Sequence, residues 1–236
     1  MRGSDRIPAC GMGIFLLLLA ACLPSPPAVE RRFDGQAAFR HIQAQLAMGP
    51  RYPGSSGWEQ VQRYIQDHVT REGWRFEVQP FVASGISGRN LIARAGHGPV
   101  ILVGAHYDTR RRADRDPERP EDPVPGANDG ASGVAVLLEL ARALDRPRLR
   151  YEVWLVFFDA EDQGELDGLP WIIGSTHFAA MLTTTPTAMI LVDMVGDADP
   201  QFIMNGIRIP CCANGSGGSR RSWVIENGLF RNPAGR

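Results

Sequence analysis

The chain has 236 residues, which is enough for one α/β domain with a full hydrophobic core and short for two. Its 44% hydrophobic and 22% charged residues are ordinary for a globular protein and argue against wholesale disorder. The formal net charge of -1 gives no electrostatic basis for binding nucleic acid, so we expect no nucleic acid partner.

The N-terminal segment is typical of an exported protein. An apolar run that starts at Ile14 is too short to span a bilayer but long enough for the core of a signal peptide. It ends in Leu19-Ala20-Ala21-Cys22, the pattern of a bacterial lipobox. We expect residues 1–22 to be a lipoprotein signal peptide, Cys22 to carry a lipid that anchors the chain to the bacterial cell envelope, and residues 23–32 to form a tether. The alternative is a secretion signal with an incidental cysteine.

The body of the chain alternates between helical and strand patterns. Apolar spacings of three and four residues predict helices at 39–46, 58–69, 134–144 and 176–181, with Ser56 and Glu59 at capping-box spacing before the second. Alternating or continuous apolar runs predict strands at 74–78, 100–105, 153–158 and 189–194, the last three buried. This order predicts a three-layer α/β/α sandwich on a mixed, mostly parallel sheet.

Acidic and imidazole side chains gather where these strands end or the next helix begins. In chain order they are His106, Asp108, Asp129, Glu161, Asp162 and Asp193. A single one would be interpreted as a helix cap or a loop residue. Several carboxylates at one sheet edge repel each other unless a cation compensates them, and an imidazole among them suits zinc. The residues themselves therefore predict a hydrolytic or acyl-transfer metal site at the carboxyl ends of the strands.

Three segments carry a more specific pattern. They are Gly104-Ala105-His106-Tyr107-Asp108-Thr109, Ala127-Asn128-Asp129-Gly130-Ala131-Ser132-Gly133 and Phe157-Phe158-Asp159-Ala160-Glu161-Asp162. They resemble the metal-site blocks of the zinc aminopeptidases and of the glutaminyl cyclases that share their fold, and the resemblance covers about residues 33–202. It implies a zinc-dependent enzyme that acts on the N-termini of peptides or proteins.

The resemblance also implies which residues bind metal. Asp129 would be the shared ligand, which bridges two zincs in a peptidase or holds one in a cyclase. Asp162 would complete the carboxylates of the catalytic metal. His106 and Asp193 would hold the second metal of a peptidase.

Two further roles follow from the same resemblance. Asp108 would orient His106 from behind. Glu161 would be the general acid/base. The expected catalytic residues are therefore Glu161 and the metal-site carboxylate Asp193.

Features beside the metal residues favour a cyclase. The loop from Arg110 to Pro117 resembles the corresponding segment of animal-type and related bacterial cyclases, and Trp171 and the stretch from Gly174 to Phe178 fit the same comparison. We therefore expect a glutaminyl-peptide cyclotransferase, which converts N-terminal glutamine to pyroglutamate and releases ammonia. The alternatives are a zinc metallo-aminopeptidase and a non-catalytic, lipid-anchored remnant of the enzyme scaffold.

The chain departs from the family pattern in its histidines. The family's catalytic zinc also takes a histidine from a late strand, but the last histidine here is His177, within a predicted helix. His41, His68 and His97 match no metal block, and we expect them to be surface or loop residues. The catalytic zinc would then keep only two carboxylates.

The sequence also changes character after Phe202. Periodicity is lost there, and restoring one base after its codon permits a translation that resembles the continuation of family members, a loop leading into an amphipathic helix. We therefore expect residues 203–236 to be an out-of-frame tail and the catalytic domain, residues 33–202, to lack its C-terminal strands and helix. Such a chain would be inactive or nearly so.

Overall fold

The computed structural model describes residues 31–197 and the short segments 224–226 and 229–231. The chain divides into the units Met1–Glu30 and Arg31–Arg236, and the described residues all belong to the second. The predicted signal peptide, nearly all of the tether and most of the predicted tail therefore lie outside the described residues. Among the helices of the described part, none is long and apolar enough to cross a membrane.

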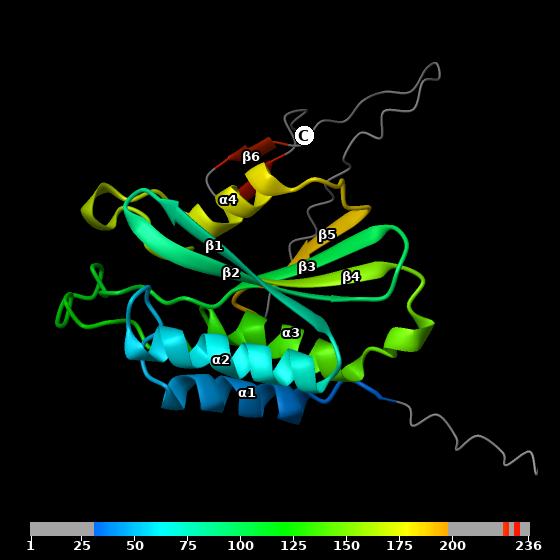
Figure 1. The fold of residues 1–236 in the computed structure, drawn as a ribbon. Helices are drawn as coiled ribbons and strands as arrows, with labels where there is room; N and C mark the ends of the chain where they lie inside the picture. The colour runs from blue at the N-terminus through cyan, green and yellow to red at the C-terminus, as the bar shows by residue number, and fades with distance from the viewer. Residues whose placement is uncertain (1–30, 198–223, 227–228, 232–236) are drawn as a thin grey trace, which may run out of the picture. The chain divides into compact units, whose positions relative to one another are not determined.

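The described elements alternate between helices and strands much as the sequence predicts (Figure 1). The helices are α1 (Gly35–Ala47), α2 (Ser56–Arg71), α3 (Ala131–Ala143) and α4 (Ile173–Met181), with the short 3₁₀ turns η1 (Arg146–Arg148) and η2 (Leu166–Gly168). The strands are β1 (Arg75–Ala83), β2 (Ile86–Ala95), β3 (Val100–His106), β4 (Glu152–Phe158), β5 (Ala188–Leu191), β6 (Val224–Glu226) and β7 (Leu229–Arg231). β6 and β7 pair with each other as a separate antiparallel hairpin.

Strands β1 to β5 form one mixed sheet in the order β1-β2-β4-β3-β5. The β1–β2 and β2–β4 pairs are antiparallel, whereas the β4–β3 and β3–β5 pairs are parallel. The prediction of an α/β fold on a mixed sheet is confirmed. The prediction that the sheet is mostly parallel is wrong, because only half of these pairings are parallel.

Strand β2 accounts for this difference, because it has no counterpart among the strands predicted from the sequence. It follows β1 through a two-residue turn in which Ser84 and Gly85 both have positive φ, 50° and 78°. Such a turn matches the twist of two antiparallel strands and joins them tightly. The Ser-Gly dipeptide between two β-prone stretches is the sequence signal for this hairpin.

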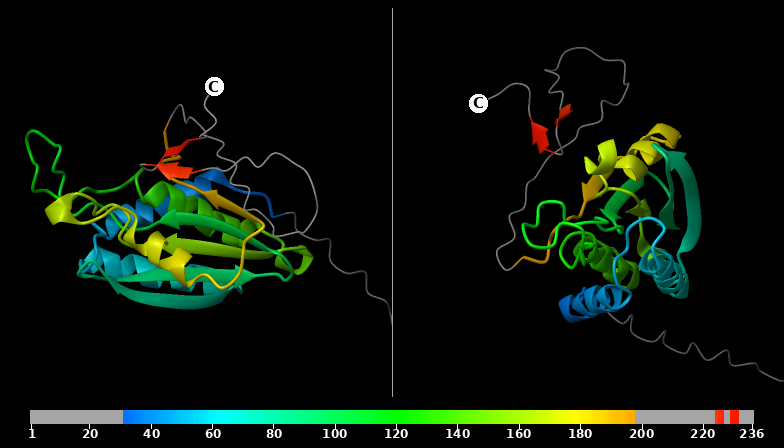
Figure 2. Two further views of the ribbon diagram at one scale, coloured as in Figure 1. Left: turned by 90° about the horizontal axis from the view of Figure 1, so that it is seen from above. Right: turned by 90° about the vertical axis from the view of Figure 1, so that its left-hand side faces the viewer.

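Helices cover both faces of the sheet, as the three-layer prediction requires (Figures 1 and 2). On one face, α2 and α3 pack against side chains such as Leu155 and Phe157 of β4, and α1 packs against α3. On the other face, Phe178 of α4 packs against a second apolar cluster that includes Trp154 and Phe158. Alternate residues of β4 thus serve opposite cores, as expected for a strand buried on both faces.

Helix α2 begins one residue earlier than the capping-box spacing suggests. Ser55, not Ser56, is the N-cap, and its hydroxyl oxygen accepts a hydrogen bond from the backbone N–H of Trp58 at 3.1 Å. The predicted box at Ser56 and Glu59 is therefore wrong by one position. The cap nevertheless fixes the start of the helix and aims Trp58 into the core.

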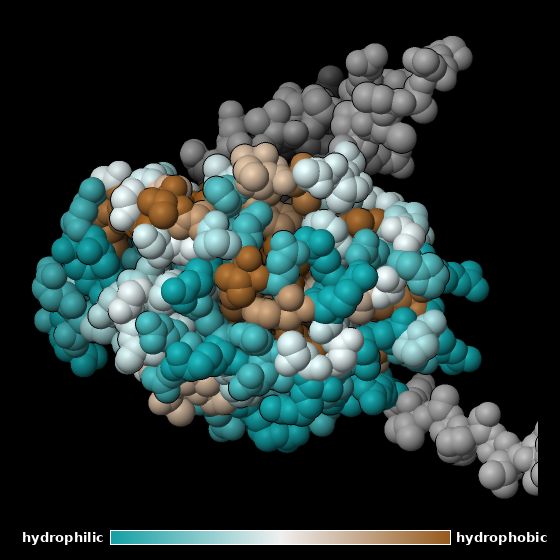
Figure 3. Space-filling view, in the orientation of Figure 1, coloured by the Kyte–Doolittle hydropathy of each residue, from teal (hydrophilic) through white to brown (hydrophobic). Residues whose placement is uncertain are grey.

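Strand β5 is an edge strand and is not buried, contrary to prediction. Its side chains Met189, Ile190 and Leu191 are 44%, 54% and 54% exposed. Apolar run length alone suggested a buried strand, but burial depends on what covers the two faces, which the run does not encode. Apolar side chains also reach the surface at Val82 of β1 and Met181 of α4. Figure 3 shows brown hydrophobic patches scattered over a mostly hydrophilic face.

Candidate metal centre

The register of the sheet brings the predicted site residues to one edge. His106 ends β3 and lies beside Phe158, the last residue of the parallel strand β4. The parallel pairing of β3 with β5 ends at Gly104 and Leu191, so Asp193 follows at the same edge. The carboxyl ends of parallel strands meet at one edge of a sheet, and ligand sites form there.

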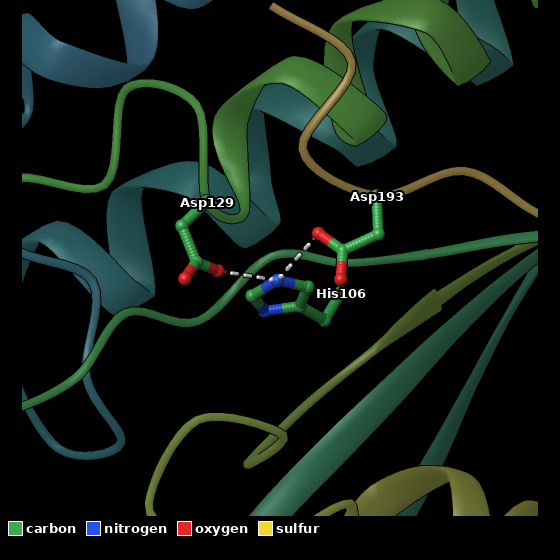
Figure 4. Close-up of side chains that lie close together, drawn as sticks. All are labelled: His106, Asp129 and Asp193. Carbon is green, nitrogen blue, oxygen red and sulfur yellow. Dashed lines mark ion pairs between the residues drawn. The ribbon is translucent and has the colours of Figure 1, made fainter. Parts of the chain in front are cut away.

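Among the residues that the structure describes, His106, Asp129 and Asp193 form a group that could hold a metal (Figure 4). Their ligand atoms all lie within 4.8 Å of one another. The Nε2 atom of His106 is 2.9 Å from Oδ1 of Asp129 and 3.4 Å from Oδ1 of Asp193. The imidazole is 4% exposed, whereas the two carboxylates are 40% and 42% exposed, so the group opens toward solvent on its acidic side.

The electrostatics of this group favour a bound cation. Burial by itself lowers the pKa of His106, but Asp108, Asp129 and Asp193 outweigh it and raise the pKa well above its usual value. Although Asp129 is close, neither ring nitrogen of His106 has a partner in hydrogen-bond geometry. A buried nitrogen without a hydrogen bond, aimed at two carboxylates, fits a zinc ion that takes one nitrogen and two oxygen ligands.

A network at the start of α3 holds Asp129 and Asp193 relative to each other. The hydroxyl oxygen of Ser132 accepts from the backbone N–H of Val195 at 3.1 Å, and Oδ1 of Asn128 accepts from that of Gly196 at 2.7 Å. The segment after β5 also passes close to α3. A Cβ atom at Gly133 would lie 2.3 Å from the carbonyl oxygen of Val192, so only glycine fits there.

Asp108 lies next to His106 but makes its hydrogen bonds elsewhere. Its Oδ1 is 3.5 Å from Nδ1 of His106, an ion-pair distance that is too long for a hydrogen bond. The carboxylate instead accepts from the backbone N–H groups of Glu161 at 2.9 Å and Asp162 at 3.3 Å, and from Nε2 of Gln163 at 3.0 Å. Fully buried Asp108 thus anchors the loop that follows β4.

Glu161 and Asp162 lie at the site, and the pKa of each carboxyl group is raised. Burial raises the pKa of Glu161 to about 7, with Asp108, Asp162 and Asp193 adding to the increase and His106 opposing it. Burial also raises the pKa of Asp162 to about 7, with Asp129 and Asp108 adding to it. A carboxyl group that titrates near neutral pH can both accept and donate a proton, which is what a general acid/base requires.

Asp162 is not part of the metal group in this structure. Its Oδ1 faces the guanidinium of Arg110, 3.4 Å from NH1, and its backbone carbonyl accepts from the same nitrogen at 3.2 Å. Arg110 is held in turn by two hydrogen bonds to Asp114 and lies over the ring of Trp171, 5.0 Å from its centroid. The Arg110–Pro117 loop therefore contacts the site through its first residue.

Three of the histidines outside the metal group have structural contacts. His41 and His68 lie half-buried on α1 and α2 with their rings 4.6 Å apart, so the prediction of surface or loop positions is wrong for both. His177 lies on α4 and stacks against Phe81, with 5.3 Å between ring centroids. His97 lies in an exposed loop, as predicted.

One residue at the site was not predicted. Arg51 is fully buried and donates hydrogen bonds to backbone carbonyls beside the metal group. It lies in the Gly-Pro-Arg-Tyr-Pro-Gly stretch before α2, which the sequence identifies only as a loop. Spacing rules offer no signal for it, because its partners are backbone atoms far away in the chain.

Comparison with known families agrees with this geometry. Residues 90–228 match the model of peptidase family M28. The chain belongs to peptidase family M28. The match takes in His106, Asp129, Glu161, Asp162 and Asp193, and it continues beyond Phe202. Whether residues 203–236 are an out-of-frame tail stays a prediction, since nearly all of them lie outside the described part.

Relatives of the M28 chain include both peptidases and cyclases. The glutaminyl-peptide cyclotransferase-like protein of Bos taurus is 29% identical over 64% of this chain and 45% of its own length. The structure resembles the glutaminyl cyclase of Bacteroides thetaiotaomicron, with 29% identity, a TM-score of 0.65, and coverage of 71% of this chain and 64% of that one. It equally resembles a leucine aminopeptidase precursor from the same species, with 28% identity, a TM-score of 0.66, and coverage of 72% and 66%. The M28 chain spans less than half the length of the first curated relatives it matches.

Proposed function

We propose that this M28 chain is a zinc-dependent glutaminyl-peptide cyclotransferase. The observation that carries the proposal is that the described residues gather one candidate metal group, His106, Asp129 and Asp193, with the Glu161 carboxyl beside it. Asp162, which the family resemblance assigns to the catalytic metal together with Asp129, is paired with Arg110 instead, so the described residues offer one metal position. One metal position favours a cyclase, whereas two favour an aminopeptidase. The sequence leaves the catalytic zinc only the two carboxylates Asp129 and Asp162, whereas the group in the structure joins one nitrogen and two oxygen ligands from His106, Asp129 and Asp193.

The chain's own residues account for the proton transfers of the cyclisation. The α-amine of an N-terminal glutamine attacks the carbon of its side-chain amide, the bond from that carbon to nitrogen breaks, and ammonia leaves. Glu161 would accept the proton from the attacking amine and deliver it to the leaving nitrogen, which its pKa of about 7 permits. Zinc bound at the group would supply a Lewis acid for the amide carbonyl. Because the amine and the amide belong to one residue, the reaction needs no activated water.

A zinc aminopeptidase is the second candidate, and the composition of the metal group favours it. His106 and Asp193 are the residues that the family resemblance assigns to the second metal of a peptidase. In that case Glu161 would take a proton from a water molecule that attacks the peptide carbonyl. If Arg110 moved away from Asp162, the Asp162 carboxylate would be free to bind the catalytic metal.

Product analysis on the full chain decides between these readings. The purified protein, loaded with zinc, is incubated with one peptide that begins with glutamine and another that begins with leucine. Against the inactivity expected from the sequence, the three-ligand group predicts ammonia and a pyroglutamyl peptide from the first and no free leucine from the second, and Glu161→Gln should abolish formation of ammonia and of the pyroglutamyl peptide. Free leucine without ammonia would establish the aminopeptidase instead. Bound zinc without either product would support a non-catalytic remnant, in line with the inactivity predicted from the sequence.

The cellular location is a separate part of the proposal. Lipid attachment at Cys22 and anchoring to the bacterial cell envelope rest on the lipobox pattern alone, because residues 1–30 lie outside the described part. On expression in a bacterial host, the protein should appear in the membrane fraction, and Cys22→Ser should shift it to the soluble fraction. An unchanged distribution would contradict the anchor.

A further inference from the structure

Arg51 is a buried cation whose hydrogen bonds all end on the loops that carry the metal group. Its side chain is fully buried, and it donates from Nε to the carbonyl of Tyr107 at 3.3 Å. Its terminal nitrogens donate to the carbonyls of Pro125 at 3.0 Å and Gly126 at 2.6 Å. Its backbone N–H donates to the hydroxyl of Thr109 at 2.9 Å.

These partners tie together two segments that are distant in the chain. Tyr107 stands between His106 and Asp108, and Gly126 begins the turn that leads to Asp129. Within that turn, the carbonyl of Gly126 also accepts from the N–H of Ala131, the first residue of α3. Arg51 thus fixes the distance between the end of β3, which supplies the imidazole ligand, and the start of α3, which supplies a carboxylate ligand.

The space around the guanidinium allows little movement. Gly126 and Gly130 both have positive φ, 64° and 85°, and a Cβ atom at Gly126 would lie 2.8 Å from NH2 of Arg51. At Gly130 a Cβ atom would be 3.5 Å from Cε1 of His106 and 3.7 Å from the same NH2. A side chain at either glycine would therefore contact the guanidinium, and one at Gly130 would also contact the imidazole. Arginine suits this place because its planar fork can bond several carbonyls at once, which the single ammonium of lysine cannot reproduce.

The charge of Arg51 also acts on the metal group. Burial lowers the pKa of the guanidinium to about 10, with Asp108 and Asp129 opposing the decrease, so Arg51 stays protonated at neutral pH. A positive charge beside Asp129 repels a divalent cation and on its own would weaken metal binding. The hydrogen bonds have the opposite effect, because they hold Asp129 and His106 in place before the metal arrives.

We propose that Arg51 is a positioning residue for the metal group, and that its hydrogen-bonded fork strengthens metal binding by more than its charge weakens it. The inference rests on the metal centre of the proposed function, whichever reaction that centre supports. It assigns Arg51 no contact with substrate.

Cobalt binding separates the two effects, because Co²⁺ substitutes for zinc and absorbs visible light. The full-length protein, Arg51→Lys and Arg51→Met are titrated with Co²⁺ alone. Lysine keeps the charge and loses the fork, whereas methionine loses both. If positioning dominates, both variants bind Co²⁺ about 10- to 100-fold more weakly than the unmodified chain, the range typical for residues that orient metal ligands. Unchanged or tighter binding by Arg51→Met would overturn the proposal, because charge repulsion would then be the main effect.

Two further variants distinguish a specific loss of metal affinity from a general loss of stability. Trp74→Phe removes a buried hydrogen bond to the carbonyl of Ala141, near the other end of α3, and should reduce stability while leaving Co²⁺ affinity unchanged. Thr109→Val removes the acceptor for the Arg51 backbone N–H at nearly constant volume and should weaken Co²⁺ binding even if Arg51→Met does not fold. Normal Co²⁺ affinity in Thr109→Val and Arg51→Lys together would refute the proposal. Absence of turnover in a chain whose Co²⁺ binding depends on Arg51 would refute the cyclase and leave the role of Arg51 intact.

Discussion

Asp108 shows how a single carboxylate can contact two parts of one site. It lies 3.5 Å from Nδ1 of His106, the ring that the family resemblance expects it to orient, and it accepts hydrogen bonds from the backbone N–H groups of Glu161 and Asp162. Three donors on one buried carboxylate fix the loop that presents the acid/base. Asparagine has one oxygen and one NH₂ group, so it would turn a donor toward a backbone N–H.

We predict that Asp108→Asn lowers kcat about 10- to 100-fold, the range typical for residues that support a catalytic centre, while Co²⁺ affinity changes little. The reason is that the substitution displaces Glu161 but leaves His106, Asp129 and Asp193 in place. Steady-state kinetics and a Co²⁺ titration on the same preparation test this, with exposed Asp67→Asn as the matched control. If metal affinity falls with kcat, Asp108 orients His106 after all.

At the residue scale, the sequence predicted which side chains gather at the sheet edge better than it predicted their contacts. Strand ends and motif spacing were enough to place His106, Asp129 and Asp193 at one edge, because parallel register fixes which residues meet. The pairing of Asp162 with Arg110 depends on the path of a loop, which has no periodicity to interpret. Arg51 could not be predicted for the same reason, since its partners are backbone carbonyls.

The helical layer contains a half-buried pair of histidines that should make it sensitive to acid. His41 on α1 is 2.6 Å from the hydroxyl of Tyr64, and Nε2 of His68 on α2 donates to the carbonyl of Leu138 on α3 at 3.0 Å. Burial, followed by the charge of His68, lowers the pKa of His41 from 6.5 to about 4, and Glu139 opposes this only weakly. In the folded chain the His41 ring is therefore neutral near pH 6.

We predict that the helical layer loses stability as the pH falls from about 6.5 toward 4. In this window the unfolded chain binds a proton at His41 that the folded chain does not, so the free energy of unfolding decreases as the pH decreases, by about 2 kcal/mol after allowance for partial exposure. Urea unfolding at several pH values measures the loss. His41→Gln can keep a hydrogen bond to Tyr64 but cannot titrate, and the loss should shrink relative to the unmodified chain. An identical pH dependence in both proteins would contradict the assignment.

At the element scale, long apolar patterns predicted the positions of helices and strands well but predicted their burial poorly. The helices and the strands β3 and β4 appear where periodicity places them, because burial on both sides imposes a regular pattern. β2 escaped notice because its polar first half hides the strand signal, and the Ser84–Gly85 turn is only a two-residue cue. β5 is exposed and not buried as expected, because a run of apolar residues does not indicate whether other elements cover the strand.

The metal group joins parts of the molecule that are far apart in the chain. His106 ends β3, Asp129 precedes α3, and Asp193 follows β5. A ligand that binds only the folded arrangement stabilises it by mass action. Bound metal should therefore stabilise the whole domain and not only its binding site.

We predict that zinc at a free concentration 100-fold above its Kd raises the free energy of unfolding by about 2.7 kcal/mol. For a domain of this size that corresponds to an increase in Tm of roughly 5–10 °C. Thermal unfolding with zinc and with a chelator measures the difference. Asp193→Asn should abolish the increase, whereas exposed Asp145→Asn should retain it. An increase that survives Asp193→Asn would mean that zinc binds elsewhere.

The strand order has a consequence for the kinetics of folding. The β1–β2 hairpin pairs neighbours such as Ala83 and Ile86, whereas the β3–β5 pair joins Ile101 to Ala188. Closing the longer loop costs more entropy, so the hairpin should form early and the β5 side late. The metal group then assembles after the rate-limiting step. In stopped-flow experiments zinc should slow unfolding while leaving the refolding rate unchanged, and faster refolding with zinc would show that the site forms earlier. A chain of this topology would acquire its hairpin before it acquires its chemistry.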